Sequence, residues 1–265
     1  MLRDITLGQY YPMDSIIHKL DPRFKILSSF AYIVALFMIK DIEIYLIIIG
    51  FLALTILLSK VPLKFILRGL KPILLIIILT FGINIFLTPG ETLYKLGPLN
   101  ITKEGFDMAV FMALRLIFLI IGTSLLTLTT SPIELTDGIE RVLNPFKRIG
   151  VPAHELAMMM TIALRFIPTL LEETDKIMKA QMARGADFES GNIIKRAKSL
   201  IPLLVPLFIG AFKRADDLAM AMEARCYRGG ENRTRMKQLR LHSRDFVSMI
   251  VFSVFFIAII YTRFM

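Results

Sequence analysis

Long apolar runs limit most strongly what this chain can fold into. Residues 45–58 and 73–83 contain no charged side chain, and 55% of the 265 residues are hydrophobic. The mean hydropathy is +0.63. A soluble domain of this length cannot enclose so much apolar surface, whereas apolar segments of about 20 residues match the thickness of a bilayer. The sequence therefore predicts an integral membrane protein built from helices.

Five segments are expected to cross the membrane. The predicted spans are residues 24–39, 44–59, 72–88, 106–129 and 246–261. The shorter ones rely on flanking polar side chains that reach the membrane interface. The first twelve residues lack the apolar stretch and cleavage site of a secretory signal, so the first span is expected to direct the chain to the membrane.

Lysine and arginine in the connecting segments indicate the orientation. Four such cations lie before or at the start of the first span, the last being Lys25, and four lie in the connection after the second, whereas the connections after the first and third spans carry one and two. Cytoplasmic connections are enriched in Lys and Arg. The N-terminus is therefore predicted to be cytoplasmic, and an odd number of spans leaves the C-terminus outside.

Three regions follow from this topology. Residues 1–130 hold four spans, residues 131–245 form a large cytoplasmic region, and residues 246–265 hold the last span. The cytoplasmic region is expected to contain one short helix, 132–143, followed by two long helices. The predicted fold is therefore an all-α integral membrane protein with about five spans.

The two long helices are expected at residues 153–184 and 193–225, as a crossed amphipathic pair or hairpin. Their first halves are apolar enough to suggest two more spans. Two such spans would place the six cations of the piece between them outside, against the usual charge distribution. We therefore expect both helices at the cytoplasmic face of the membrane.

A short motif closes each long helix. Its first copy is Ala183, Arg184 and Gly185, and its second, forty-one residues later, is Ala224, Arg225 and Cys226. Each arginine could simply neutralise the negative end of its own helix. A repeated pair in the same frame instead favours docking, because a guanidinium binds carboxylates with two parallel hydrogen bonds. The two copies predict two contacts with a two-part partner.

Individual residues mark helix ends and one buried charge. Ser131 is expected to cap the short helix, and Asp21 with Pro22 to begin the first span. Arg115 lies within the fourth span, where an isolated cation is costly. It pairs with another helix of the protein, lies nearer the interface, or belongs to a transport path.

The sequence offers no chemistry of its own. It has no glycine-rich phosphate loop ending in Lys and Ser or Thr, so ATP hydrolysis is not expected of this chain. Its three histidines are far apart with no carboxylate or thiol at ligand spacing, and its single cysteine cannot form an internal disulfide. We expect no catalytic, cofactor or metal site. A basic tail is expected near anionic lipid headgroups rather than nucleic acid; it consists of Arg233, Arg235, Lys237, Arg240 and Arg244.

Several motifs together resemble the transmembrane T component of energy-coupling factor (ECF) transporters. They occupy residues 18–25, 130–132, 144–152, 163–168 and 181–185, and the resemblance covers essentially the whole chain. It implies a non-catalytic scaffold in the plasma membrane. Such a scaffold joins two ABC-type ATPases, of the EcfA and EcfA′ type, to an S component that captures a vitamin or a transition-metal ion.

The resemblance also implies a role for the repeated motif. In that family two Xaa-Arg-Gly motifs dock into grooves on the two ATPases, which bind the ATP, and this role is carried to Arg184 and Arg225. Cys226 stands where the family pattern has glycine. Whether the second helix ends as tightly as the first therefore stays open.

Two other classes are weighed as alternatives. A secondary transporter would need inverted repeats of spans with polar sites at mid-membrane, and the predicted spans hold few polar groups beyond Asn84 and Arg115. A membrane-embedded enzyme would need a cluster of His, Asp, Glu or Cys near one membrane face. Either would act without ATPase partners, and both are less favoured than the scaffold.

Overall fold

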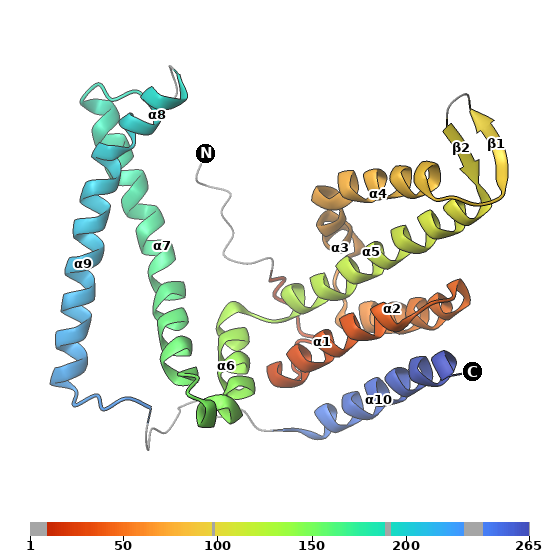
Figure 1. The fold of residues 1–265 in the computed structure, drawn as a ribbon. Helices are drawn as coiled ribbons and strands as arrows, with labels where there is room; N and C mark the ends of the chain where they lie inside the picture. Colours follow the sequence, from red (N-terminus) through yellow and green to blue (C-terminus); the bar gives the residue numbers. More distant parts are fainter. Residues whose placement is uncertain (1–9, 97–98, 189–191, 231–240, 265) are drawn as a thin grey trace. The chain divides into compact units, whose positions relative to one another are not determined.

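The computed structural model describes residues 10–96, 99–188, 192–230 and 241–264, which fold into two compact units (Figure 1). The bundle unit contains residues 10–142 and 241–264, and the hairpin unit contains residues 143–188 and 192–230. Arg233, Arg235, Lys237 and Arg240 of the basic tail lie outside the described residues.

The bundle unit is built around one long helix, α5 (Lys103–Thr129), which contacts four other helices. Those four are α1 (Pro22–Met38), α2 (Tyr45–Ser59), α3 (Leu63–Leu70) and α4 (Leu74–Leu87). The last helix, α10 (Ser243–Phe264), packs on α1. The remaining elements are α6 (Pro132–Leu143) and the antiparallel strands β1 (Thr92–Leu96) and β2 (Leu99–Thr102).

Five helical segments of the described chain are long and apolar enough to cross a membrane. They are Ile42–Ser59, Leu63–Leu87, Lys103–Thr129, Ala153–Ala183 and Ser243–Thr262. This confirms an all-α integral membrane protein. Four of these segments overlap predicted spans. The predicted span 24–39 corresponds to α1, which has only 17 residues, and the fifth segment is one of the two predicted long helices.

Two connections and one long helix differ from the prediction. Residues 60–71 were expected to link two spans but contain α3, and Pro72 sits in the 3-10 turn η3 (Lys71–Ile73) between α3 and α4. A proline there interrupts regular helix because it has no amide hydrogen and its ring crowds the preceding turn. The connection after α4 forms the β1–β2 hairpin. The second long helix is interrupted at Leu200, two residues before Pro202, which is favourable in the first turn of a new helix.

Local sequence determines two helix starts as expected. The Asp21 side chain accepts a hydrogen bond from the Arg23 amide at 2.9 Å, and α1 begins at Pro22. The Ser131 hydroxyl accepts from the Glu134 amide at 3.3 Å, while Glu134 reaches back to the Ser131 amide at 3.4 Å. This reciprocal capping box satisfies donors that a helix start leaves unpaired.

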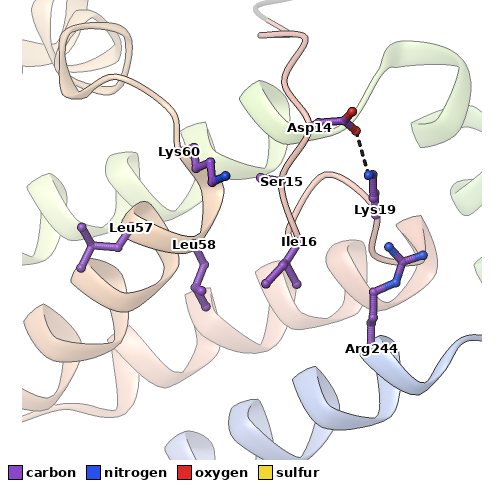
Figure 2. Close-up of a pocket in the computed structure, with 8 residues that line it drawn as sticks. All are labelled: Asp14, Ser15, Ile16, Lys19, Leu57, Leu58, Lys60 and Arg244. Atoms are coloured by element: carbon purple, nitrogen blue, oxygen red, sulfur yellow. Dashed lines mark ion pairs between the residues drawn. The ribbon is translucent and has the colours of Figure 1, made fainter.

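A buried carboxylate ties the last helix to the first. Asp245 is 1% exposed and accepts hydrogen bonds from the Asp21 amide at 2.9 Å and from the His242 amide at 2.7 Å. The two oxygens of one side chain thus pair with backbone amides before α1 and at the start of α10. Beside them, the segment before α1 carries an ion pair of 2.9 Å between Asp14 and Lys19 (Figure 2).

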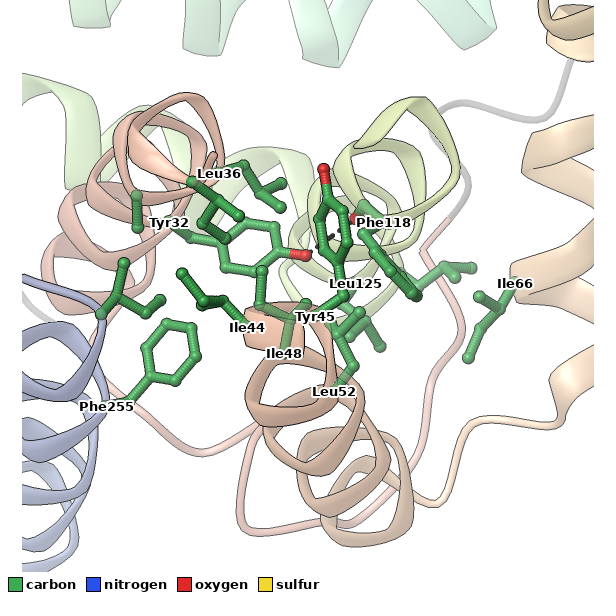
Figure 3. Close-up of a cluster of buried hydrophobic side chains, with 14 of the residues drawn as sticks. Tyr32, Leu36, Ile44, Tyr45, Ile48, Leu52, Ile66, Phe118, Leu125 and Phe255 are labelled. Carbon is green, nitrogen blue, oxygen red and sulfur yellow. Dashed lines mark hydrogen bonds between the residues drawn. The ribbon is translucent and has the colours of Figure 1, made fainter. Parts of the chain in front are cut away.

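Aliphatic and aromatic side chains together fill the centre of the bundle (Figure 3). Phe51 stacks on Phe255 with ring centroids 4.1 Å apart, and Tyr32 lies against both rings. The Tyr32 hydroxyl donates to the Phe118 carbonyl at 2.9 Å. Gly122 permits this arrangement, because a Cβ atom there would lie 2.2 Å from Tyr32 Cε1. The absence of a side chain at Gly122 of α5 therefore leaves room for the Tyr32 ring of α1.

Arg115 pairs with another helix, as one of the predicted alternatives stated. Its Nη2 donates to the Ile39 carbonyl at 2.8 Å, at the C-terminal end of α1. Its guanidinium carbon also lies 4.6 Å from the Phe111 ring centroid and 5.5 Å from that of Phe37. A cation is favoured at the negative end of a helix and over aromatic rings. These contacts offset the cost of placing the charge within a span.

Candidate docking hairpin

Two long helices form the hairpin unit. They are α7 (Ala153–Ala183) and α9 (Ile201–Ala224), preceded by η4 (Asn144–Ile149) and linked through α8 (Ile193–Ser199). The helices α7 and α9 run antiparallel, side by side (Figure 1). At one end the Gln181 side-chain amide donates to the Pro202 carbonyl at 3.4 Å; at the other, the His154 ring lies 3.1 Å from the Tyr227 hydroxyl.

An ion pair joins the middles of the two helices. The Arg214 guanidinium donates to the Glu173 carboxylate, and the two residues are 41 positions apart. This is the same separation as between Arg184 and Arg225. Equivalent positions of the repeat therefore meet at the centre, as they do in an antiparallel pair with an approximate local two-fold axis. The copies of the motif consequently lie at opposite ends.

The first motif closes α7 with a Schellman turn. Arg184 is the C-cap residue of α7, and Gly185, which follows it, adopts φ +87°. The Gly185 amide donates to the Met182 carbonyl and the Ala186 amide to the Gln181 carbonyl, both at 3.0 Å. These are the two reverse bonds of the Schellman motif, which pair carbonyls that a helix end leaves free. The predicted stop at Gly185 is confirmed.

The second motif closes α9 in the same way. The Cys226 amide donates to the Glu223 carbonyl at 2.8 Å and the Tyr227 amide to the Met222 carbonyl at 3.0 Å. Arg225 has nearly the backbone angles of Arg184, with φ −91° and ψ 9° against φ −89° and ψ 7°. Cys226 adopts φ 56°, in the left-handed region that disfavours side chains. The second helix thus ends as tightly as the first, without the glycine.

Both motifs are open to a partner. The residues Ala183, Arg184, Gly185, Ala224, Arg225 and Cys226 are all exposed. Neither arginine forms an ion pair with another residue of the described part of the chain. Each arginine is the C-cap residue at the negative end of its helix. The structure therefore places two similar cationic tips on one rod.

The length of the rod sets the distance between the tips. From His154 to Gln181, whose side chains contact the two ends of α9, the helix α7 extends on the order of 40 Å at 1.5 Å per residue. A single small groove cannot receive both tips. Any contact made by both tips must therefore involve two separate surfaces.

Sequence reasoning missed the residues that secure the second tip. The Tyr227 hydroxyl contacts the His154 ring and also lies 3.0 Å from Met158 Sδ. These contacts hold the C-terminal end of α9 against the first turns of α7. A packing contact from Tyr227 was itself predictable, because the final residue of a Schellman turn often makes one. The partners of Tyr227 are about seventy residues away and could not be assigned from sequence.

The fold defines a multi-pass helical membrane protein, and its candidate site is a docking hairpin. Among the described residues no group of three or more His, Cys, Asp and Glu is placed to hold a metal ion. The family model for CbiQ, the cobalt transport protein, matches residues 13–236. The chain therefore belongs to this family.

Close relatives specify the branch of the family. Proteins described as energy-coupling factor transporter transmembrane protein EcfT match from Thermosediminibacter oceani, at 63% identity over 99% of both chains, and from Clostridium kluyveri, at 64% identity over 94% of this chain and 93% of the relative. The Bacillus subtilis relative is 48% identical over 95% of this chain and 96% of its own. The resemblance to the ECF transmembrane component is confirmed.

Proposed function

We propose that this chain is the scaffold subunit of an ECF-type ABC importer. It couples ATP hydrolysis by two cytoplasmic ATPase subunits to uptake through an S component that binds the substrate. One observation carries the proposal: the two arginine motifs have the same backbone geometry, are both exposed, and lie at opposite ends of one hairpin. Two equivalent tips call for two similar partner grooves, as a pair of related ATPases would supply.

The hairpin also suits the transmission of motion. The contacts at both ends and the central pair of Glu173 and Arg214 make α7 and α9 one stiff body. When ATP draws two partner subunits together, tips anchored in both must tilt or shift that body. A rigid element between two moving anchors passes the displacement on. In this proposal the hairpin carries it to the surface that holds the S component.

The remaining parts of the proposal concern location and substrate. The chain lies in the plasma membrane with its N-terminus and hairpin in the cytoplasm and its C-terminus outside, in keeping with the distribution of Lys and Arg. ATP is bound by the partners, and this subunit is non-catalytic. The cargo is a vitamin or a transition-metal ion, and cobalt is named in the family description. The choice of cargo belongs to the S component.

Reversing the charge of both tips tests the docking role. The variant Arg184→Glu with Arg225→Glu is expected to reduce co-purification of the ATPases by about ten-fold or more, since each change places a carboxylate where a guanidinium is bound. The matched control is Lys176→Glu with Lys213→Glu, which reverses two exposed charges along the hairpin. Equal recovery of the ATPases with the tip variant and the wild type would contradict the proposal, as would an equal loss with the control.

A further inference from the structure

A cationic pocket lies in the bundle unit, at the ends of three elements. The segment before α1 contributes Ile16 and Lys19, the C-terminal end of α2 contributes Leu58 and Lys60, and the start of α10 contributes Arg244 (Figure 2). The pocket encloses about 320 Å³. All of these residues belong to one compact unit, so the fold itself brings them together.

The charges in this pocket do not balance. Lys19 pairs with Asp14, and this contact lowers the pKa of the carboxyl, so Asp14 stays ionised and neutralises Lys19. Lys60 and Arg244 are exposed and have no ion-pair partner among the residues that the structure describes. Three cations and one carboxylate line the cavity, so its net positive charge attracts an anion, and Lys and Arg side chains bind phosphate oxygens well.

Lys60 occupies an unusual backbone position. It follows the last residue of α2 with φ 56°, and its amide donates to the Ile56 and Leu57 carbonyls. This left-handed turn is ordinarily made by glycine or asparagine, so a lysine costs stability there. The hydrogen bonds of the turn are made by the Lys60 backbone amide and do not involve its ammonium group. A lysine at a position that favours glycine or asparagine is consistent with a ligand that binds its ammonium group.

Part of the pocket lining is apolar and exposed. Leu57, Ile16 and Leu58 are 76%, 51% and 38% exposed. In Figure 2 the side chains of Ile16 and Leu58 both point downward, away from Asp14 at the top of the view. Both leucines belong to a helix that is long and apolar enough to span the membrane. Such side chains suit hydrocarbon tails and add nothing to the binding of a free phosphate ion.

We propose that this pocket binds the headgroup of an anionic phospholipid. Lys60 and Arg244 hold the headgroup phosphate, Lys19 lies beside it, and the acyl chains run along Leu57 and Leu58. The ligand would fix the start of α10 to the end of α2 at the membrane surface. This site is separate from the docking hairpin, and it stands or fails independently of the proposed partners.

The test uses the full chain purified in mild detergent and examined by native mass spectrometry. Phosphatidylglycerol and phosphatidylcholine with the same acyl chains are added in equal amounts. The test variant is Lys60→Gly with Arg244→Gln, in which glycine suits the left-handed turn and the fold is preserved. The control is Lys64→Gln with Lys71→Gln, which removes two exposed cations outside the pocket, at the first and last turns of the neighbouring helical segment.

The wild type is expected to retain phosphatidylglycerol in preference to phosphatidylcholine. The pocket variant is expected to lower that preference by about ten-fold or more, and the control by less than about two-fold, because each cation near a headgroup contributes separately. The variant Lys60→Arg with Arg244→Lys keeps both charges and is expected to keep the preference. Equal retention by the wild type and the pocket variant would overturn the proposal. Displacement of the lipid by excess inorganic phosphate alone would show a phosphate site instead, which would also overturn it.

Discussion

Glu173 and Arg214 occupy equivalent positions of the internal repeat and form an ion pair with each other. One lies on α7 and the other on α9, 41 residues apart, and their side chains are 28% and 27% exposed. A residue can meet its own equivalent only near the axis that relates two copies. The ion pair therefore marks the centre of the hairpin. It explains why the two arginine tips lie at opposite ends of the rod.

Breaking this central pair should loosen the hairpin. Glu173→Gln and Arg214→Gln are each expected to lower the local stability of α7 and α9 by about 0.5 to 1 kcal/mol, the range for partly exposed ion pairs. Hydrogen exchange of the helix amides measures the effect. The swapped variant Glu173→Arg with Arg214→Glu should recover part of the loss. A swapped variant whose loss equals the sum of the two single losses would show that the pair contributes nothing.

The turn at Cys226 predicts an asymmetry between the two tips. Cys226→Gly is expected to leave the hairpin as stable or up to about 1 kcal/mol more stable, because glycine adopts φ 56° without steric cost. Cys226→Val is expected to destabilise it by about 1 to 2 kcal/mol, since a β-branched residue fits the left-handed region poorly. Thermal unfolding of the purified variants measures both effects. A valine variant as stable as the glycine variant would contradict the observed turn.

Helix ends set by local residues were predictable from sequence, whereas the turn at Cys226 was not. Ser131, Asp21 and Gly185 act within a few residues of themselves, and their roles as helix ends were predictable from local rules. The equivalence of Arg184 and Arg225 was visible as a repeat. The Schellman turn at Cys226 was not, because the residue itself disfavours it and the surrounding helix enforces it.

Long-range contacts were beyond the reach of sequence patterns. Asp245 accepts the amide of Asp21, 224 positions away, and no local signal links them. The pairing of Glu173 with Arg214 depends on the antiparallel arrangement, which the repeat allowed but did not require. The helix α3 and the β1–β2 hairpin lie in connections whose charge and hydropathy do not indicate secondary structure. Tertiary packing decided these features.

Gly122 provides a test of the close approach between α1 and α5. Gly122→Ala places a methyl group where the Tyr32 ring lies, which would force the ring aside and break its hydrogen bond to Phe118. We expect a loss of about 1 to 3 kcal/mol, as for other overpacked cores. Gly50→Ala is the matched control, because nothing lies within 4 Å of a Cβ atom there. It should be neutral or slightly stabilising, since alanine favours helix. Equal thermal stability of the two variants would contradict the close approach of Tyr32, labelled in Figure 3, to Gly122.

The buried imidazole of His18, just before α1, predicts how stability depends on pH. Its Nε2 lies 2.9 Å from the Tyr11 carbonyl, which can only accept, so Nε2 carries the hydrogen. In the neutral ring Nδ1 then accepts from the Ser15 hydroxyl, which lies 2.6 Å away. Burial lowers the pKa of His18 below its ordinary value of 6.5. His18 therefore binds a proton less readily in the folded state than in the unfolded chain.

The sign of the effect follows from this difference in proton binding. Above about pH 6.5 both states are neutral at His18 and its stabilising contribution is complete. As the pH falls through the ordinary pKa, the unfolded chain binds more protons, so the free energy of unfolding decreases until the folded-state pKa is reached. Thermal unfolding of the wild type between about pH 8 and 5 should show this loss, and His18→Gln should show a shallower pH dependence. Identical slopes for the two proteins would mean that His18 is already charged or exposed in the folded state.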